Sequence, residues 1–228
     1  MRPSRIDHAV RVALVLLATA GAHSASAQEG NSSLFEKLNL DKLRLSALGG
    51  SVGAMKPSQM HATRSYSLHS DYGEIVPSIR VVFTATYWES RYTDKAVRRF
   101  SDQFRTNLSD PAGDDELRES RIKVSDIAVT ADLRYDFWNR PTMRGYIGGG
   151  GGAHVLNGEG KYISQTFIET SLDNIAAGVL ALIGGEIVVG QRVSVGIQGR
   201  YDLLSGVSYG SIRFTGSYHF AATEPGAK

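Results

Sequence analysis

Apolar and polar residues alternate over long stretches of this chain. From Ile127 to Trp138 (IAVTADLRYDFW), the odd-numbered positions are apolar, and the even-numbered positions, Trp138 included, form a largely polar set. Segments 78–90, 192–204 and 211–220 alternate in the same way. A period of two places alternate side chains on opposite faces of a β-strand. The pattern therefore predicts an all-β chain whose strands each have an apolar and a polar face.

Eight strands are predicted, and the connections between them fall into two sets. The first, third, fifth and seventh connections include the long segments 91–120 and 157–173, whereas the second, fourth and sixth are all short. Long outer loops and short periplasmic turns are typical of outer-membrane barrels. We therefore expect an eight-stranded antiparallel up-and-down transmembrane β-barrel over residues 42–220. The predicted strands are 42–55, 62–72, 78–90, 127–138, 143–156, 175–189, 192–204 and 211–220.

The aromatic residues indicate which face meets lipid. A soluble lipocalin-like carrier would turn the same apolar face inward. Here the aromatic residues of that face fall near strand ends, with mostly Val, Ile, Leu and Ala between them. Two aromatic bands around an aliphatic middle suit the two lipid–water interfaces, so the membrane barrel is favoured. The expected bands are Tyr72, Tyr135, Phe137, Tyr218 and Phe220 at the periplasmic rim, and Tyr87 and Tyr201 at the outer rim.

The polar face carries charges of both signs. An eight-stranded barrel has a lumen that side chains just fill, so these charges are expected to pair with one another across strands or to contact water. This predicts a polar plug that holds the strands in register; a narrow path for a small solute is the alternative. The expected lumen network comprises Arg80, Asp132, Arg134, Asp136, Glu186, Arg200, Asp202 and Arg213.

Three stretches carry a family resemblance: 144–153 (RGYIGGGGGA), 184–204 (GGEIVVGQRVSVGIQGRYDLL) and 210–220 (GSIRFTGSYHF). They resemble the small eight-stranded outer-membrane barrels, the group of the OmpA membrane domain, OmpX, OmpW and the opacity proteins. The resemblance implies that the barrel-assembly machinery recognises the last strand through Tyr218 and Phe220. Two features depart from the family: residues AATEPGAK follow Phe220, and Thr215 stands where the family tends to have Gly.

The ends of the chain are expected to lie outside the barrel. Arginines precede the short apolar run VALVLLATA, and Ala25-Ser26-Ala27 fits a cleavage site, so residues 1–27 are predicted to be a signal peptide. Residues 28–41 then form a periplasmic segment, with a possible short helix at 34–43, and 221–228 a flexible tail. Together these features predict the outer membrane of a Gram-negative-type bacterium.

Composition excludes several classes of function. The chain has no Cys, which rules out disulfides and thiol chemistry. Removal of the signal peptide leaves basic and acidic residues in balance, so nucleic-acid binding is disfavoured. Gly148–Gly152 lack the Lys-Ser/Thr and the strand-to-helix context of a phosphate-binding loop. We expect no cofactor and no metal.

The histidines of the mature chain give no catalytic prediction. His69 and His219 share polar faces with serines, but residues two apart on one strand lie about 7 Å apart, so a catalytic arrangement would need residues from other strands. The His-x-Ser arrangement of the lipid-A deacylase family is absent after the signal peptide. We therefore expect hydrogen-bonding roles for His61, His69, His154 and His219 and no catalytic residues.

The segment 91–120 is the most individual part of the sequence. Val97, Phe100, Phe104 and Leu108 recur at helical spacing after Asp94, which predicts an amphipathic helix at 94–108. Basic residues on its other face suit contact with lipopolysaccharide phosphates; the alternative is a solvated lid on the barrel mouth.

These observations favour a non-enzymatic, monomeric outer-membrane barrel with a structural or surface-interaction role, whose partners are outer-membrane lipids and lipopolysaccharide. The alternatives are a narrow OmpW-like conduit for small hydrophobic solutes, an outer-membrane lipid-modifying enzyme, or the soluble carrier.

Overall fold

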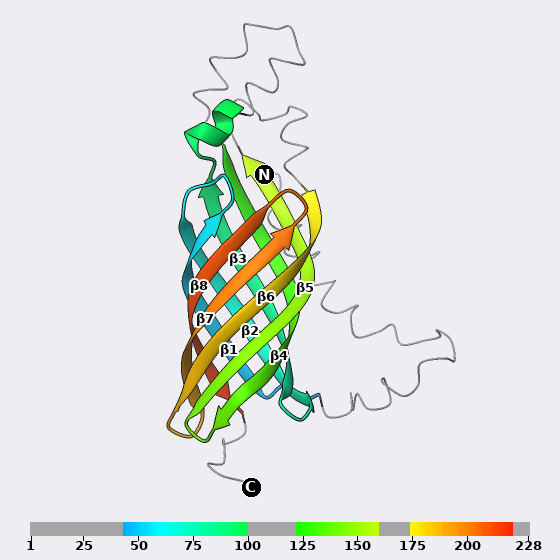
Figure 1. Cartoon of the computed structure of the whole chain (residues 1–228), viewed down its shortest axis with the longest axis vertical. Helices are drawn as coiled ribbons and strands as arrows, with labels where there is room; N and C mark the ends of the chain where they lie inside the picture. The colour runs from blue at the N-terminus through cyan, green and yellow to red at the C-terminus, as the bar shows by residue number, and fades with distance from the viewer. Residues whose placement is uncertain (1–42, 100–121, 160–173, 221–228) are drawn as a thin grey trace, which may run out of the picture. The chain divides into compact units, whose positions relative to one another are not determined.

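The computed structural model describes residues 43–99, 122–159 and 174–220 (Figure 1). The expected signal peptide, the periplasmic segment 28–41 and the tail 221–228 lie outside these residues. No helix among the described residues is long and apolar enough to cross a bilayer.

Eight strands form one closed antiparallel barrel in which each pairs with its neighbours in the sequence (Figure 1). The first and last strands close the ring, with Ala47 opposite His219 and Pro57 opposite Tyr209. The predicted eight-stranded up-and-down barrel is confirmed. The strands are β1 (Ala47–Pro57), β2 (Thr63–Val76), β3 (Ile79–Arg91), β4 (Lys123–Arg140), β5 (Met143–Glu159), β6 (Asn174–Val189), β7 (Val193–Leu204) and β8 (Ser208–His219).

Both ends of several strands differ from the sequence expectation. β1 begins at Ala47 rather than at residue 42, and β2 continues to Val76 instead of ending near residue 72. An irregular register between Asp71 and Glu74 accommodates Gly73, which has a φ of 79° and donates its backbone N–H to the Asp71 carboxylate at 2.7 Å. Glycine adopts this conformation without a steric penalty, so the strand bends at Gly73 instead of ending there.

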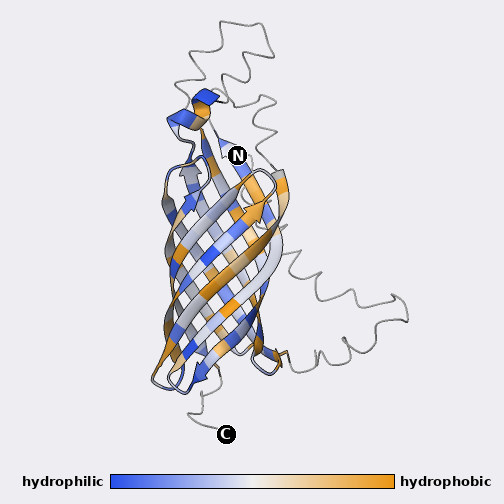
Figure 2. Ribbon diagram, in the orientation of Figure 1, coloured by the Kyte–Doolittle hydropathy of each residue, from blue (hydrophilic) through white to orange (hydrophobic). Residues whose placement is uncertain are grey.

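The two faces of the barrel have opposite polarity. Leu68 and Phe214 are 69% and 66% exposed on the outside, whereas Asp132 on the inside is 1% exposed. Figure 2 shows hydrophobic and hydrophilic residues alternating along the strands. A water-soluble carrier requires the reverse arrangement, so that alternative is wrong. The chain forms a transmembrane barrel, with an apolar surface for acyl chains and a polar interior.

The three turns 77–78, 141–142 and 190–192 lie at one end of the barrel, the short-turn end, and the connections after β1, β3, β5 and β7 lie at the other, the long-loop end. Six of the expected aromatic residues are 44–53% exposed on the outer surface near these ends, whereas Tyr72 is half-buried beside Phe83. Tyr66 pairs with Tyr87 near the long-loop end and is 52% exposed, so it extends the outer band beyond the prediction.

Trp138 is a correction to the predicted faces. The period of two assigned it to the interior, but it is 50% exposed on the outer surface, as is its neighbour Phe137 at 53%. A β-bulge between Asp136 and Trp138 inserts one residue and reverses the alternation from that point. Trp138 therefore joins the aromatic band at the short-turn end.

The chain's two tryptophans provide a test of this orientation, because Trp88 is 0% exposed inside the barrel. In bilayers of lipids with brominated acyl chains, Trp88→Phe, which retains Trp138, should lose most of its tryptophan emission. Trp138→Phe, which retains Trp88, should keep most of its emission because the barrel wall separates Trp88 from the acyl chains. Equal quenching of both variants would contradict the assigned faces.

Candidate functional site

The barrel interior is the candidate functional site, because each strand from β2 to β8 contributes buried polar side chains to it. The inward residues include carboxylates, arginines, Ser and Thr hydroxyls and three histidines. All eight residues of the expected lumen network lie on this face and are buried.

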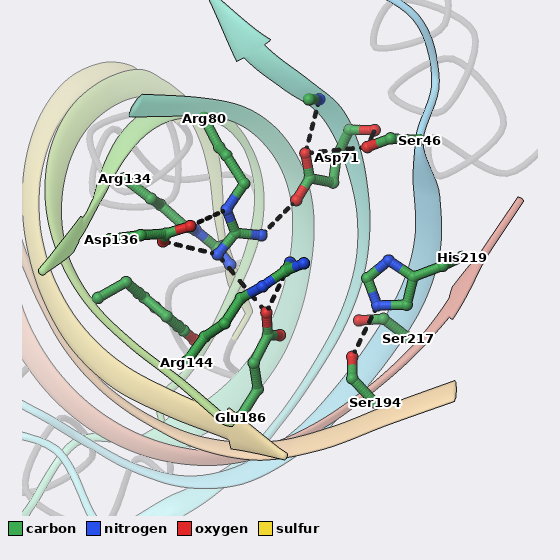
Figure 3. Close-up of polar contacts among 12 residues, drawn as sticks. Ser46, Asp71, Arg80, Arg134, Asp136, Arg144, Glu186, Ser194, Ser217 and His219 are labelled. Carbon is green, nitrogen blue, oxygen red and sulfur yellow. Dashed lines mark hydrogen bonds and ion pairs between the residues drawn. The ribbon is translucent and has the colours of Figure 1, made fainter. Parts of the chain in front are cut away.

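The densest part of the network surrounds Arg80 near the short-turn end (Figure 3). Its guanidinium lies 2.6 Å from Asp71, 2.9 Å from Asp136 and 3.6 Å from Glu186, and so joins β2, β3, β4 and β6. Arg144 approaches the same Glu186 oxygen at 3.5 Å. A single buried cation thus contacts carboxylates from three other strands.

Two further ion pairs form along a strand and not across strands as the sequence analysis expected. Arg134 donates to Asp132 at 2.7 Å on β4, and Arg200 donates to Asp202 at 2.7 Å on β7. Side chains two residues apart point to the same face, and a folded-back arginine spans the roughly 7 Å between their Cα atoms. The guanidinium of Arg134 also lies 5.1 Å from the centre of the Tyr146 ring.

Arg213 differs from the other network arginines. It is 1% exposed, and the structure places no carboxylate oxygen of the described residues within 4.0 Å of it. Its donors instead reach the hydroxyls of Ser211 and Ser67 at 3.1 Å and of Thr86 at 3.4 Å.

Asp126 is the main interior residue that the sequence analysis missed. One of its oxygens accepts hydrogen bonds from Trp88 Nε1 at 3.1 Å and Tyr209 Oη at 3.3 Å, and lies 2.9 Å from His154 Nδ1. The recognised alternation began at residue 127, whereas β4 begins at Lys123. Extension of the period of two by one residue would have found it.

An apolar layer lies beyond Asp126 at the long-loop end. Met55, Met60, Trp88 and Tyr209 are each at most 1% exposed and pack with Val124, Leu156 and Ala176. Tyr92, just after β3, packs against this layer, and burial raises the pKa of its hydroxyl above the ordinary tyrosine value. Apolar side chains therefore cover the polar interior at this end.

His69, His154 and His219 form side-chain hydrogen bonds with residues of other strands, whereas the side chain of His61 is exposed. His69 on β2 lies 2.8 Å from the Ser217 hydroxyl of β8, and His219 lies 3.0 Å from Ser194 of β7. No hydrogen bond joins either imidazole to a carboxylate among the described residues. No group of three or more His, Asp or Glu in the described ranges is arranged to hold a metal ion.

The helix expected after β3 begins at Asp94 and is described as far as residue 99. Thr93 Oγ1 accepts the backbone N–H of Ala96 at 3.3 Å, which caps the first turn. Ala96 and Val97 are buried, whereas Lys95, Arg98 and Arg99 are exposed. The remainder of the predicted helix lies outside the described residues.

Solved structures with low sequence identity align with this barrel. Neisserial surface protein A matches 78% of this chain and 98% of its own, with 14% identity and a TM-score of 0.49. A major outer membrane protein of Thermus thermophilus matches 78% and 100%, with 9% identity and a TM-score of 0.47. The outer membrane enzyme PagL matches 75% and 98%, with 13% identity and a TM-score of 0.39. The chain matches no protein-family model, and no curated protein is significantly similar to it in sequence.

The strand order and the apolar exterior decide the type of fold. The chain has the fold of the small eight-stranded outer-membrane β-barrels. Sequence identities of 9–14% carry no information on the ligand or the activity of this chain.

Proposed function

We propose that this protein is a non-enzymatic outer-membrane barrel with a structural or surface-interaction role, and that its lumen is a closed polar plug. The observation that carries the proposal is the filling of the interior from one end to the other. The Arg80 cluster occupies the short-turn end, the ion pairs of Arg134 and Arg200 the middle, and the apolar layer around Trp88 the long-loop end.

A closed lumen has a direct electrical test. After refolding is verified by heat-modifiable gel mobility, the protein inserted in planar bilayers should give no conductance steps above background. Deletion of residues 93–121 should leave this result unchanged, because the apolar layer formed by strand residues still closes the lumen. A porin in the same bilayer is the positive control, and discrete steps from the wild-type protein would favour the conduit instead.

The serine–histidine pairs are part of the non-enzymatic proposal. Ser217–His69 and Ser194–His219 lie inside the barrel wall, where lipid acyl chains on the outer surface do not reach them. We expect His69→Ala and His219→Ala to leave the lipid-A profile of the host and its surface peptidase activity unchanged. A changed lipid-A profile or a lower peptidase activity in one variant, with normal amounts of folded protein, would indicate that the protein is an enzyme.

The exposed surfaces suggest the partners. The basic residues Lys95, Arg98 and Arg99 at the long-loop end suit contact with lipopolysaccharide phosphates. Tyr218 and Phe220 form an edge-to-face pair at the C-terminal end of the last strand, on the short-turn side of the barrel, with ring centres 6.0 Å apart. This is the region expected to engage the barrel-assembly machinery. We propose insertion by that machinery and a monomer in the outer membrane.

A further inference from the structure

Arg213 is a buried cation without an ion-pair partner among the described residues. The arginines 80, 134 and 200 each lie 2.6–2.7 Å from a carboxylate oxygen, but Arg213 meets only hydroxyl groups. Its Nη2 has no hydrogen-bond partner among the described residues. A guanidinium stays protonated, and a buried charge without a direct ion-pair partner is unfavourable.

A second unpaired group lies in the same row of the barrel. Gly53 on β1 pairs with Arg213 on one side and with Ser65 on the other. The Ser65 hydroxyl is buried and has no hydrogen-bond partner among the described residues. Two hydrogen-bonding groups without partners therefore flank a position that has no side chain.

Gly53 is what lets Arg213 reach across β1. A Cβ at this position would lie 2.8 Å from Arg213 Cγ, so the arginine side chain lies over the glycine. It extends from β8 to the hydroxyls of Ser67 on β2 and Thr86 on β3. The guanidinium is thus placed toward the Ser65 side of the lumen, away from its own strand.

We propose that a small monovalent anion, chloride under ordinary conditions, binds in the lumen against Arg213 Nη2 and the Ser65 hydroxyl. A halide accepts hydrogen bonds from N–H and O–H donors and would place a negative charge in direct contact with the guanidinium. The two atoms are almost inaccessible to solvent, so the ion that we propose is a small halide and not a larger oxyanion. This inference does not depend on the proposed surface role, because the ion is bound within the plug and does not pass through it.

Crystals of the wild-type protein grown in sodium bromide test the site without any substitution. We expect an anomalous difference peak beside Arg213 Nη2. An ordered water with no bromide there, or bromide at surface sites only, would overturn the proposal.

Urea unfolding in vesicles tests the same site in solution. At constant ionic strength, replacement of gluconate by chloride should stabilise the wild type, with the folded-to-unfolded ratio rising up to about tenfold per tenfold rise in chloride above the dissociation constant. Arg213→Gln should abolish this dependence, and Ser65→Ala should shift it to higher chloride. Arg192→Gln, in the exposed turn before β7, is the matched control and should respond like the wild type.

Coincident chloride and gluconate curves for the wild type would contradict the site, as would an undiminished response in Arg213→Gln. If Arg213→Gln does not fold, the bromide experiment and the Ser65→Ala response decide the matter.

Discussion

Replacement of Arg80 with methionine should lower the free energy of unfolding by about 3–5 kcal/mol, because it leaves buried carboxylates without their cation. Asp71 and Asp136 have side chains that are 9% and 1% exposed, and both lose their only ion-pair partner among the described residues. Glu186 keeps Arg144 at 3.5 Å. Urea unfolding in lipid vesicles measures the loss.

Arg144→Met is the matched control for Arg80→Met. Its side chain is more exposed, at 18%, and its single ion pair is longer, so a loss of about 1 kcal/mol or less is expected. Equal losses in the two variants would show that Arg80 has no special role.

The charge mechanism has two further readouts. The deficit of Arg80→Met should shrink as the pH falls from neutral toward about 4, because protonation removes the uncompensated negative charges. Asp71→Asn and Asp136→Asn, added to Arg80→Met, should restore part of the lost stability at neutral pH. A loss caused only by altered packing would respond to neither change.

The faces of the strands were predictable because alternation is a local property of the sequence. Asp132 and Arg134 could be assigned to the interior from their immediate neighbours alone. The same reasoning failed wherever a bulge inserts a residue, as it does before Trp138, because a bulge leaves no mark in the hydrophobic pattern.

The partners of the interior charges were not predictable from alternation. Arg80 contacts residues 9, 56 and 106 positions away. Asp71 and Asp136 lie on the neighbouring strands β2 and β4, where the register decides the contact, whereas Glu186 lies on β6, across the lumen. Arg134 and Arg200 instead form ion pairs with carboxylates on their own strands. Whether an arginine pairs along its own strand or with another strand depends on the side chains across the lumen. The sequence of a single strand does not contain that information.

The structure shows which neighbouring atoms require the glycine run of β5. Gly148, Gly150 and Gly152 lie on the inward face of β5, opposite Arg134, Asp132 and Thr130 of β4. The sequence analysis excluded a phosphate loop, but it had no means to show how closely the backbone of β4 approaches. Because the backbone of β4 lies so close to β5, the barrel has no room for side chains at these three glycines.

Gly150→Ala should therefore lower the free energy of unfolding by about 2–3 kcal/mol and reduce the yield of folded protein. A Cβ at Gly150 would clash with the carbonyl oxygen of Ala131 and would lie 2.7 Å from Asp132 Cα. Both are backbone atoms of the paired strand, so relief requires β4 and β5 to separate. Heat-modifiable gel mobility gives the folded fraction, and urea unfolding in vesicles gives the stability.

Gly216→Ala on β8 is the matched control, because a Cβ at this position would meet no atom within 4 Å. There the substitution only restricts the unfolded chain, so a change of less than about 1 kcal/mol, in the stabilising direction, is expected. Gly149→Ala should fall between the two, since its added Cβ would lie 3.3 Å from the Leu180 carbonyl oxygen. From the most to the least stable, the predicted order of the variants is thus Gly216→Ala, Gly149→Ala and Gly150→Ala. If Gly150→Ala were as stable as Gly216→Ala, β4 and β5 could not lie as close together as the structure places them.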